Sequence, residues 1–316
     1  MKKAVWVGAA VLIALSGFLG CSRQKAAGGA GKTRIGYICN NFNDTFQGYI
    51  MNETKAFFAD KPDYELIFQD AQEDVIKQQD LANTLLAQGV KGLIVVPVNT
   101  NATEPITRAA QEAKIPLIYV NRNPFGNQSL PPNVYYVGSR EVIAGQMQME
   151  AMGKLLGGSG GVAILIGKLD NEGALLRTEG NEDTIRREFP GITVLAKETG
   201  NWQRDQGLSL TENWLTAYGT NLKGILANND EMALGAAEAL KGAGRTDVLV
   251  MGVDAIPDAK AAVGDGSLAA TVLQDAAGQG RGAAEAAYKA LRGEFQESIN
   301  WVPFVLITKE NLAQYQ

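Results

Sequence analysis

Short β-rich runs alternate with amphipathic stretches along the chain from Thr33 onward. The runs TRIGYIC, YELIFQD, GLIVVP and PLIYV have the length and composition of buried strands. The segments between them, such as DTFQGYIMNETKAFFAD and VIKQQDLANTLLAQ, carry apolar residues at helical spacing. Because strands that alternate with helices are joined by right-handed crossovers, the pattern predicts an α/β fold with a parallel sheet covered on both faces.

The same alternation restarts after the segment NVYYVGSREVIAG. The second series has GVAILIG, ITVLA, KGILA and VLVMGV as strands, with RDQGLSLTENWLTAYG and DEMALGAAEALKGAG among its helices. Near the end, SLAATVLQD predicts a strand, AAGQGRGAAEAAYKALRGE a helix and NWVPFVLIT one further strand. With 316 residues the chain is longer than one core usually needs, so two doubly wound parallel-sheet lobes are predicted.

The first residues have the layout of an export signal, with two lysines before an apolar or small run from Ala4 to Gly20. That run is slightly short for a membrane span, which needs about 20 residues. The stretch SGFLGC resembles the bacterial lipoprotein cleavage motif, in which Cys21 becomes the lipid-modified first residue. An uncleaved anchor or an ordinary secretory signal is the alternative. We therefore expect a signal peptide over residues 1–20, a lipidated tether over 21–32, and an exported protein anchored to the cell envelope.

The composition limits the classes of partner that the protein can bind. The formal net charge of −5 argues against a nucleic-acid-binding protein, because phosphate contacts need a basic face. The chain has no histidine, and its second cysteine, Cys39, lies in an apolar strand, where we interpret it as a small core residue.

Polar and aromatic residues gather where predicted strands end. In open α/β sheets, ligands bind outside the carboxyl ends of the strands. The candidates at these ends are Asp44, Phe46, Asn121, Arg122, Arg177, Trp202, Asn229, Asp254 and Gln274. Carboxylates, amides and guanidinium groups together can bond every hydroxyl of a neutral sugar, and aromatic rings stack on its apolar faces.

Some of these residues also have simpler interpretations. Asp44 could only cap the helix that follows it, and Asp230 is expected to cap its own helix. Phe46 and Trp202 could be core aromatics, and Arg177 could belong to a surface ion pair.

Several longer motifs resemble the periplasmic galactose/glucose-binding proteins, with the ribose- and inositol-binding proteins close by. They are YYVGS, NNDEMALGAAEALKGAG, MGVDAIPDAKAAVGDGSLAATVLQD and VPFVLITKENL, and the similarity extends from Thr33 to the end. The resemblance implies a type I periplasmic binding protein fold, with two lobes joined by a three-strand hinge. The N-terminal lobe would comprise 33–138 plus 275–300, and the C-terminal lobe 139–274 plus 301–316.

The resemblance also implies roles for single residues. Phe46 and Trp202 would sandwich the sugar ring. Hydroxyls would be bonded by Asp44, Asn121, Arg177, Asn229 and Asp254. Gln274 occupies a position that is Asn in the hexose binders and Gln in the ribose binder. Arg122 occupies a position that is Lys in the hexose binder and Arg in the ribose and inositol binders. Asn228 and Asp230 would be supporting residues.

Two segments depart from the hexose-binding pattern. The stretch KLDNEGALLR offers Asn171 and Glu172 where hexose binders place a histidine and an aspartate, so these two are further candidates. LLGGSGG has no carboxylate where those proteins have a calcium loop, so we expect no calcium, other metal or cofactor.

The sequence thus predicts a monomeric, non-catalytic lipoprotein that captures a neutral monosaccharide by hinge closure. Glucose or galactose is the first candidate for that monosaccharide. Its implied partners are an ABC permease of the inner membrane, a chemoreceptor and, through the lipid, the membrane. An inositol- or pentose-binding protein of the same fold is the alternative. A sugar-cleaving enzyme is a hypothesis of another class, since Asp44 and Asp254 would face one cleft. A sugar-responsive repressor would need a helix-turn-helix where the signal and tether lie.

Overall fold

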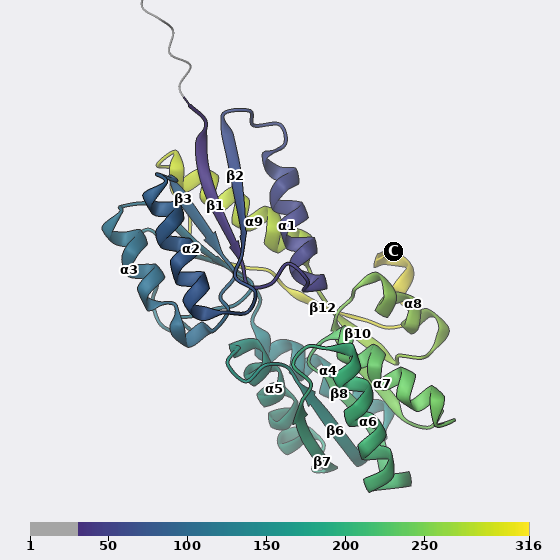
Figure 1. The fold of residues 1–316 in the computed structure, drawn as a ribbon. Coiled ribbons are helices and arrows are strands. Elements are labelled where there is room, and N and C mark those ends of the chain that lie inside the picture. Colours follow the sequence, from purple (N-terminus) through teal and green to yellow (C-terminus); the bar gives the residue numbers. More distant parts are fainter. Residues whose placement is uncertain (1–30, 316) are drawn as a thin grey trace, which may run out of the picture. The chain divides into compact units, whose positions relative to one another are not determined.

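Two six-stranded sheets organise residues 31–315, the part of the chain that the computed structural model describes (Figure 1). The first sheet has the order β11-β5-β4-β3-β1-β2 and the second the order β12-β10-β9-β8-β6-β7. Neighbouring strands run parallel except β10 and β12, which pair antiparallel. The two doubly wound parallel lobes predicted from the alternation are confirmed.

Strand bounds follow the predicted runs closely. The first sheet contains β1 (Thr33–Cys39), β2 (Tyr64–Asp70), β3 (Gly92–Val95), β4 (Leu117–Val120), β5 (Val134–Gly138) and β11 (Ile299–Trp301). The second sheet contains β6 (Ser159–Ile166), β7 (Gly191–Thr199), β8 (Leu222–Ala227), β9 (Leu249–Asp254), β10 (Ala270–Gln274) and β12 (Phe304–Ile307).

Helices cover both faces of each sheet (Figure 1). Those of the first lobe are α1 (Thr45–Phe58), α2 (Val75–Ala87), α3 (Glu104–Glu112) and α9 (Ala276–Leu291). Those of the second are α4 (Glu141–Leu155), α5 (Glu172–Glu188), α6 (Arg204–Tyr218), α7 (Asp230–Gly242) and α8 (Pro257–Asp265). Single 3₁₀ turns span Thr100–Ala102, Gly219–Asn221 and Leu312–Tyr315.

The chain passes between the two sheets three times, after β5, after β10 and after β11. One expected element is wrong here, because NWVPFVLIT forms two strands instead of one. Residues of β11 pair parallel with β5, and those of β12 pair antiparallel with β10. The break falls at Val302 and Pro303, where proline lacks the N–H that a continuous ladder needs.

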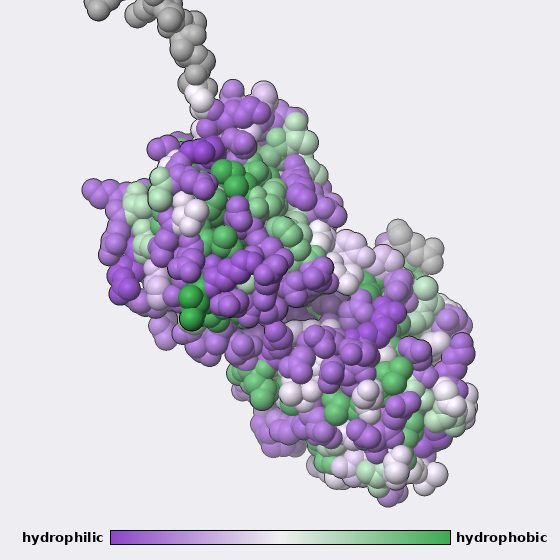
Figure 2. All heavy atoms as spheres, viewed as in Figure 1, coloured by the Kyte–Doolittle hydropathy of each residue, from purple (hydrophilic) through white to green (hydrophobic). Residues whose placement is uncertain are grey.

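Each sheet is buried between two apolar layers. In β1, Ile35 and Tyr37 pack in the cluster formed with α1 and α9, whereas Ile38 packs on the opposite face among residues of α2 and α3. Cys39 lies in the first of these clusters as a free, fully buried thiol, in agreement with its interpretation as a core residue. The face visible in Figure 2 is largely hydrophilic, with hydrophobic residues in scattered groups.

Many helices begin directly after a strand, and a short polar side chain caps their first turn. Asp74, Asn171, Asn229 and Asp275 accept hydrogen bonds from backbone N–H groups of α2, α5, α7 and α9. These caps bring the amino ends of helices to the carboxyl edge of each sheet. Within the described residues no helix has the length and apolar content needed to cross a membrane. The predicted signal peptide and Cys21 lie outside those residues.

Candidate functional site

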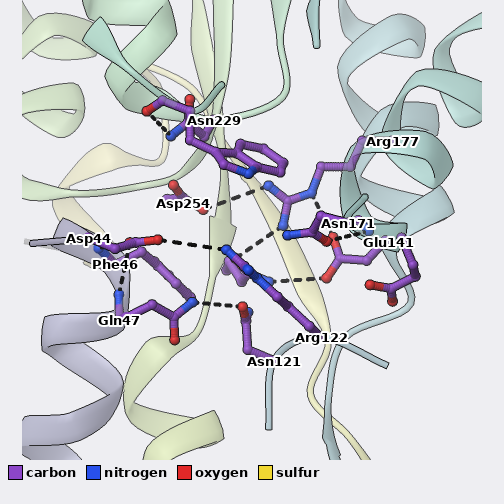
Figure 3. A pocket seen from close by; sticks show the side chains of 14 residues that line it. Asp44, Phe46, Gln47, Asn121, Arg122, Glu141, Asn171, Arg177, Asn229 and Asp254 are labelled. Atoms are coloured by element: carbon purple, nitrogen blue, oxygen red, sulfur yellow. Dashed lines mark hydrogen bonds and ion pairs between the residues drawn. The ribbon is translucent and has the colours of Figure 1, made fainter. Parts of the chain in front are cut away.

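One cavity receives the carboxyl ends of strands from both sheets. Fourteen residues line it, and Figure 3 shows their side chains: Asp44, Phe46, Gln47, Asn121, Arg122, Glu141, Asn171, Glu172, Gly173, Arg177, Trp202, Asn229, Asp254 and Gln274. About 410 Å³ of space lies free of protein atoms among them, and part of this space is open solvent. Every residue that the sequence proposed for a ligand is in this set.

The topology explains this convergence. The first sheet contributes residues that follow β1 and β4, and the second contributes residues that follow or end β6, β7, β8, β9 and β10. Parallel strands end on one edge of their sheet, so polar residues that are far apart in sequence meet there. The three remaining lining residues, Gln47, Glu141 and Gly173, were not singled out from the sequence.

Arg177 is the most highly connected side chain of the cavity (Figure 3). Its Nε donates to Glu141 Oε2 at 2.6 Å, its Nη1 to the carbonyl oxygen of Asn228 at 2.6 Å, and its Nη2 to Gln274 Oε1 at 3.2 Å. Asp254 Oδ1 lies 3.9 Å from Nη1. Burial opposes the charge, but the carboxylates of Glu141 and Asp254 raise the pKa of Arg177, which stays a cation. The surface ion pair considered from the sequence is therefore wrong, because the pair with Glu141 is buried.

Two glycines make the Arg177–Glu141 pair possible. Helices α4 and α5 approach so closely that a Cβ on Gly145 would lie 1.9 Å from the carbonyl oxygen of Arg177, and one on Gly180 would lie 2.2 Å from that of Val142. Any larger residue at either position would push the helices apart. The small residues thus place an arginine of α5 against the first residue of α4.

Asp44 combines capping with exposure to the cavity. Its Oδ1 accepts the backbone N–H groups of Phe46 and Gln47, so it does cap α1. Its Oδ2 lies 4.0 Å from Nη2 of Arg122, whose Nη1 donates to the carbonyl oxygens of Pro97 and Val98. Burial raises the pKa of Asp44, and Arg122 partly offsets this shift. The second oxygen remains available for a ligand hydroxyl.

Asn121 is held from both sides by amides. Gln47 Nε2 donates to its Oδ1 at 2.8 Å, and its Nδ2 donates to Gln279 Oε1 at 3.1 Å. The Oε1 atom of Gln47 is buried without a hydrogen-bond partner among the described residues. Asn121 adopts a positive φ of 68°, which asparagine tolerates better than most residues. Gln47 is therefore a further candidate for ligand contact.

Trp202 lies on the second-lobe side of the cavity and is positioned by its neighbours. A Cβ on Gly167 would lie 2.1 Å from Cζ2 of the indole ring, so only glycine admits the ring there. Asn229 Nδ2 donates to the backbone oxygen of Trp202 at 3.2 Å, while Asn229 Oδ1 caps α7 through the N–H of Met232. On the opposite side, Phe46 is buried at the start of α1 and belongs to a core cluster as well as to the cavity lining.

Asp230 does not cap its helix, which corrects the sequence expectation. Asn229 is the N-cap, and Asp230 is the first residue of α7. The carboxyl group of Asp230 instead accepts from Thr271 Oγ1 at 2.6 Å and from the N–H of Ile256 at 3.0 Å. These bonds hold the segment after β9 next to β10, and burial raises the pKa of Asp230 to about 7. Asp230 is therefore a supporting residue behind Asp254.

The segment that departs from the hexose-binding pattern also reaches the cavity. Asn171 caps α5 with its Oδ1, which accepts the N–H of Gly173. Burial and the nearby Glu141 carboxylate raise the pKa of Glu172 to about 8, and the backbone N–H of Asn123 partly opposes the shift. Burial raises the pKa of Asp254 well above its ordinary value. The carboxyl group of Glu172 therefore resists ionisation at neutral pH, and burial opposes the ionisation of Asp254 as well.

Direct contacts also join the two lobes at the mouth of the cavity. Lys168 Nζ, which follows β6, lies 2.6 Å from Glu73 Oε2, which follows β2. Thr45 Oγ1 at the start of α1 donates to Glu231 Oε1 of α7 at 3.2 Å. In the described part of the chain, no group of three or more acidic, histidine or cysteine side chains is placed to hold a metal ion.

Comparison with known proteins gives consistent matches. The family model described as a periplasmic binding protein domain matches residues 35–295. A putative rhizopine-binding protein of Rhizobium meliloti is 41% identical over 285 residues, which cover 89% of this chain and 92% of that protein. The ribose import binding protein of Salmonella typhimurium is 31% identical over 289 residues, with coverages of 92% and 95%.

A solved structure is similarly close. It is an ABC transporter solute-binding protein from Bacillus halodurans with bound myo-inositol, and it is 38% identical to this chain. The TM-score is 0.84, and the match covers 91% of this chain and 98% of that one.

Proposed function

The chain belongs to the periplasmic binding protein family of non-catalytic solute-binding proteins, and from this premise we propose that its cavity captures a cyclitol or pentose for an ABC importer. The observation that carries the proposal is the convergence of both sheets on one cavity whose walls offer amides, carboxylates, guanidinium groups and two aromatic rings. Such a set bonds many hydroxyls at once.

The comparisons favour inositol and pentose over the glucose or galactose expected first. The relatives named above are described as binding rhizopine, ribose and myo-inositol. Within the cavity, Arg122 and Gln274 are the residues that the resemblance associates with ribose or inositol binders, and Asn171 and Glu172 replace the histidine and aspartate of hexose binders. The same positions therefore support the alternative.

The mechanism is hinge closure. A ligand that contacts Asp44 and Arg122 from the first lobe and Arg177 and Asp254 from the second stabilises the arrangement in which both sets face it. Closure brings together surfaces of the two lobes that a permease can recognise. We further propose that the protein is exported and held near that permease by a lipid on Cys21, with a chemoreceptor as a second partner.

Calorimetric titration of the chain from Lys32 onward tests this function. The ligands are myo-inositol, D-ribose, D-xylose, D-glucose and D-galactose, and we expect micromolar or tighter binding of inositol or a pentose. Asp254→Ala should weaken that binding by roughly tenfold or more, because it removes a buried acceptor. Asp258→Ala, at an exposed position of α8, is the matched control and should bind as the unchanged protein does.

Two results would contradict the proposal. If no sugar or polyol binds, the proposed ligand class is wrong. If only glucose or galactose binds tightly, the protein is a hexose-binding protein, as first expected from the sequence. Recovery of unaltered ligand after prolonged incubation with stoichiometric protein checks the non-catalytic assignment.

A further inference from the structure

The cavity contains more acidic than basic side chains. Its titratable lining consists of four carboxyl groups and two guanidinium groups, namely Asp44, Glu141, Glu172, Asp254, Arg122 and Arg177. A buried excess of negative charge is unfavourable unless a cation compensates it or the carboxyl groups take up protons. A strictly neutral ligand offers no compensation.

The two arginines are already engaged. Glu141 takes the closest contact with Arg177, at 2.6 Å, and Asp44 faces Arg122 at 4.0 Å. Asp254 is only 7% exposed, shares Arg177 at 3.9 Å, and accepts no hydrogen bond from another described residue. Asp254 thus lines the cavity with a carboxyl group that Arg177 compensates only at a distance.

Glu172 is a second carboxyl group whose negative charge is incompletely compensated. Its Oε2 is buried and has no hydrogen-bond partner among residues 31–315, and it forms no ion pair there. The carboxylate of Glu141 lies near enough to repel it. Its place in the first turn of α5 favours a carboxylate there, because the amino end of a helix carries partial positive charge. A residue that lines the cavity therefore has one buried carboxyl oxygen without a hydrogen-bond donor among the described residues.

We propose that the preferred ligand is a polyhydroxylated molecule that bears a protonated amine, such as an aminocyclitol or amino sugar, and that Glu172 receives the ammonium group. The inference rests on the proposed function and specifies its ligand class. An ammonium group supplies one positive charge and three N–H donors, which match a lone buried carboxylate oxygen and the incompletely compensated carboxyl group of Asp254. The remaining amides and arginines bond the hydroxyls.

Matched pairs of ligands test this assignment by calorimetry. The pairs are amino-deoxy-scyllo-inositol with scyllo-inositol, and D-glucosamine with D-glucose, with N-acetyl-D-glucosamine as a neutral derivative of the amine. We expect the amine of at least one pair to bind about tenfold or more tightly than its neutral partner, which corresponds to about 1.4 kcal/mol. Glu172→Gln should abolish this preference, because it removes the negative charge that the ammonium group would meet. Glu179→Gln, which removes an exposed carboxylate from the same helix, should preserve it.

Proton exchange gives a second readout. The charged groups that face Glu172 are Glu141 of α4, Arg177 of α5 and Arg122 after β4. Because free Glu172 holds its proton at neutral pH, binding of an ammonium group should release up to about one proton. Titrations in buffers of different ionisation enthalpy measure that number, which should fall towards zero in Glu172→Gln.

Failure of the amine assignment can be distinguished from failure of the proposed binding function. If neutral polyols bind as tightly as their amines, or if Glu172→Gln weakens both equally, the amine assignment is overturned and the binding function stands. If neither amines nor neutral polyols bind, both fail.

Discussion

Replacing Arg177 with methionine should lower the free energy of unfolding of the ligand-free protein by about 3–5 kcal/mol. The guanidinium group bonds a carboxylate of α4, a backbone carbonyl between β8 and α7, and an amide of β10. Methionine has a side chain of comparable length but no charge. Its introduction leaves Glu141, which is 2% exposed, as a buried carboxylate without its cation.

A double-mutant cycle measures how much the ion pair between Arg177 and Glu141 contributes to stability. Urea unfolding followed by circular dichroism would compare the unchanged protein with Arg177→Met, Glu141→Gln and the double variant. Because the double variant no longer contains the buried Glu141 charge, it should be more stable than Arg177→Met, with a coupling energy of roughly 2 kcal/mol. Arg187→Met, at an exposed arginine of the same helix, should change stability by no more than about 0.5 kcal/mol.

A small loss of stability in Arg177→Met would contradict a buried, uncompensated Glu141. A loss below about 1 kcal/mol for Arg177→Met is what an exposed ion pair gives, and it would mean that water reaches Glu141 readily. A coupling energy near zero would show that the two side chains contribute independently.

Three further predictions concern the ring, the mouth and the pH response of the cavity. Gly167→Ala should displace the Trp202 indole, lower ligand affinity by roughly tenfold and alter tryptophan fluorescence on binding; unchanged affinity would contradict the close approach. Lys168→Met should weaken binding by about threefold to fivefold in low salt and less in high salt, since its bridge to Glu73 joins the lobes but stays partly exposed. The free energy of unfolding should fall as pH rises from about 5 to about 8, because Glu172, with a pKa of about 8, holds a proton in the folded chain that it has lost in the unfolded chain. Urea titrations at several pH values measure this dependence. For Glu172→Gln, the fall in unfolding free energy should be smaller by up to about 1.4 kcal/mol per pH unit.

The fold and most of the cavity follow from one rule applied to the sequence. Strand runs were recognisable because both faces of each sheet are buried, and the residues just beyond the strands were sought because parallel strands share a carboxyl edge. Asp44 and Asp254 were found in this way. The family resemblance added Asn171 and Glu172, through the departure of their segment from the hexose pattern.

The missed residues gave no distinguishing local signal. Gln47 and Glu141 sit in the first turns of α1 and α4, and Gln47 lies next to Phe46, which was found. Their roles depend on partners distant in sequence, Asn121 and Arg177. For Asp230, local sequence favoured a cap, but tertiary contacts with Thr271 and the backbone of Ile256 took its carboxylate and left the cap to Asn229.

Ligand recognition and lobe closure share the same side chains at the back of the cavity. Glu141 begins α4 just after the chain first crosses between the sheets, and Gln274 ends β10 just before it crosses again. Gln274 Nε2 donates to Glu141 Oε1 at 3.2 Å, and Arg177 bonds both residues. A ligand that draws on Arg177 therefore also acts on a network that fixes two of the three crossings. Substitutions in this network should change affinity and the balance between open and closed states together, whereas changes at Phe46 should alter affinity with less effect on that balance.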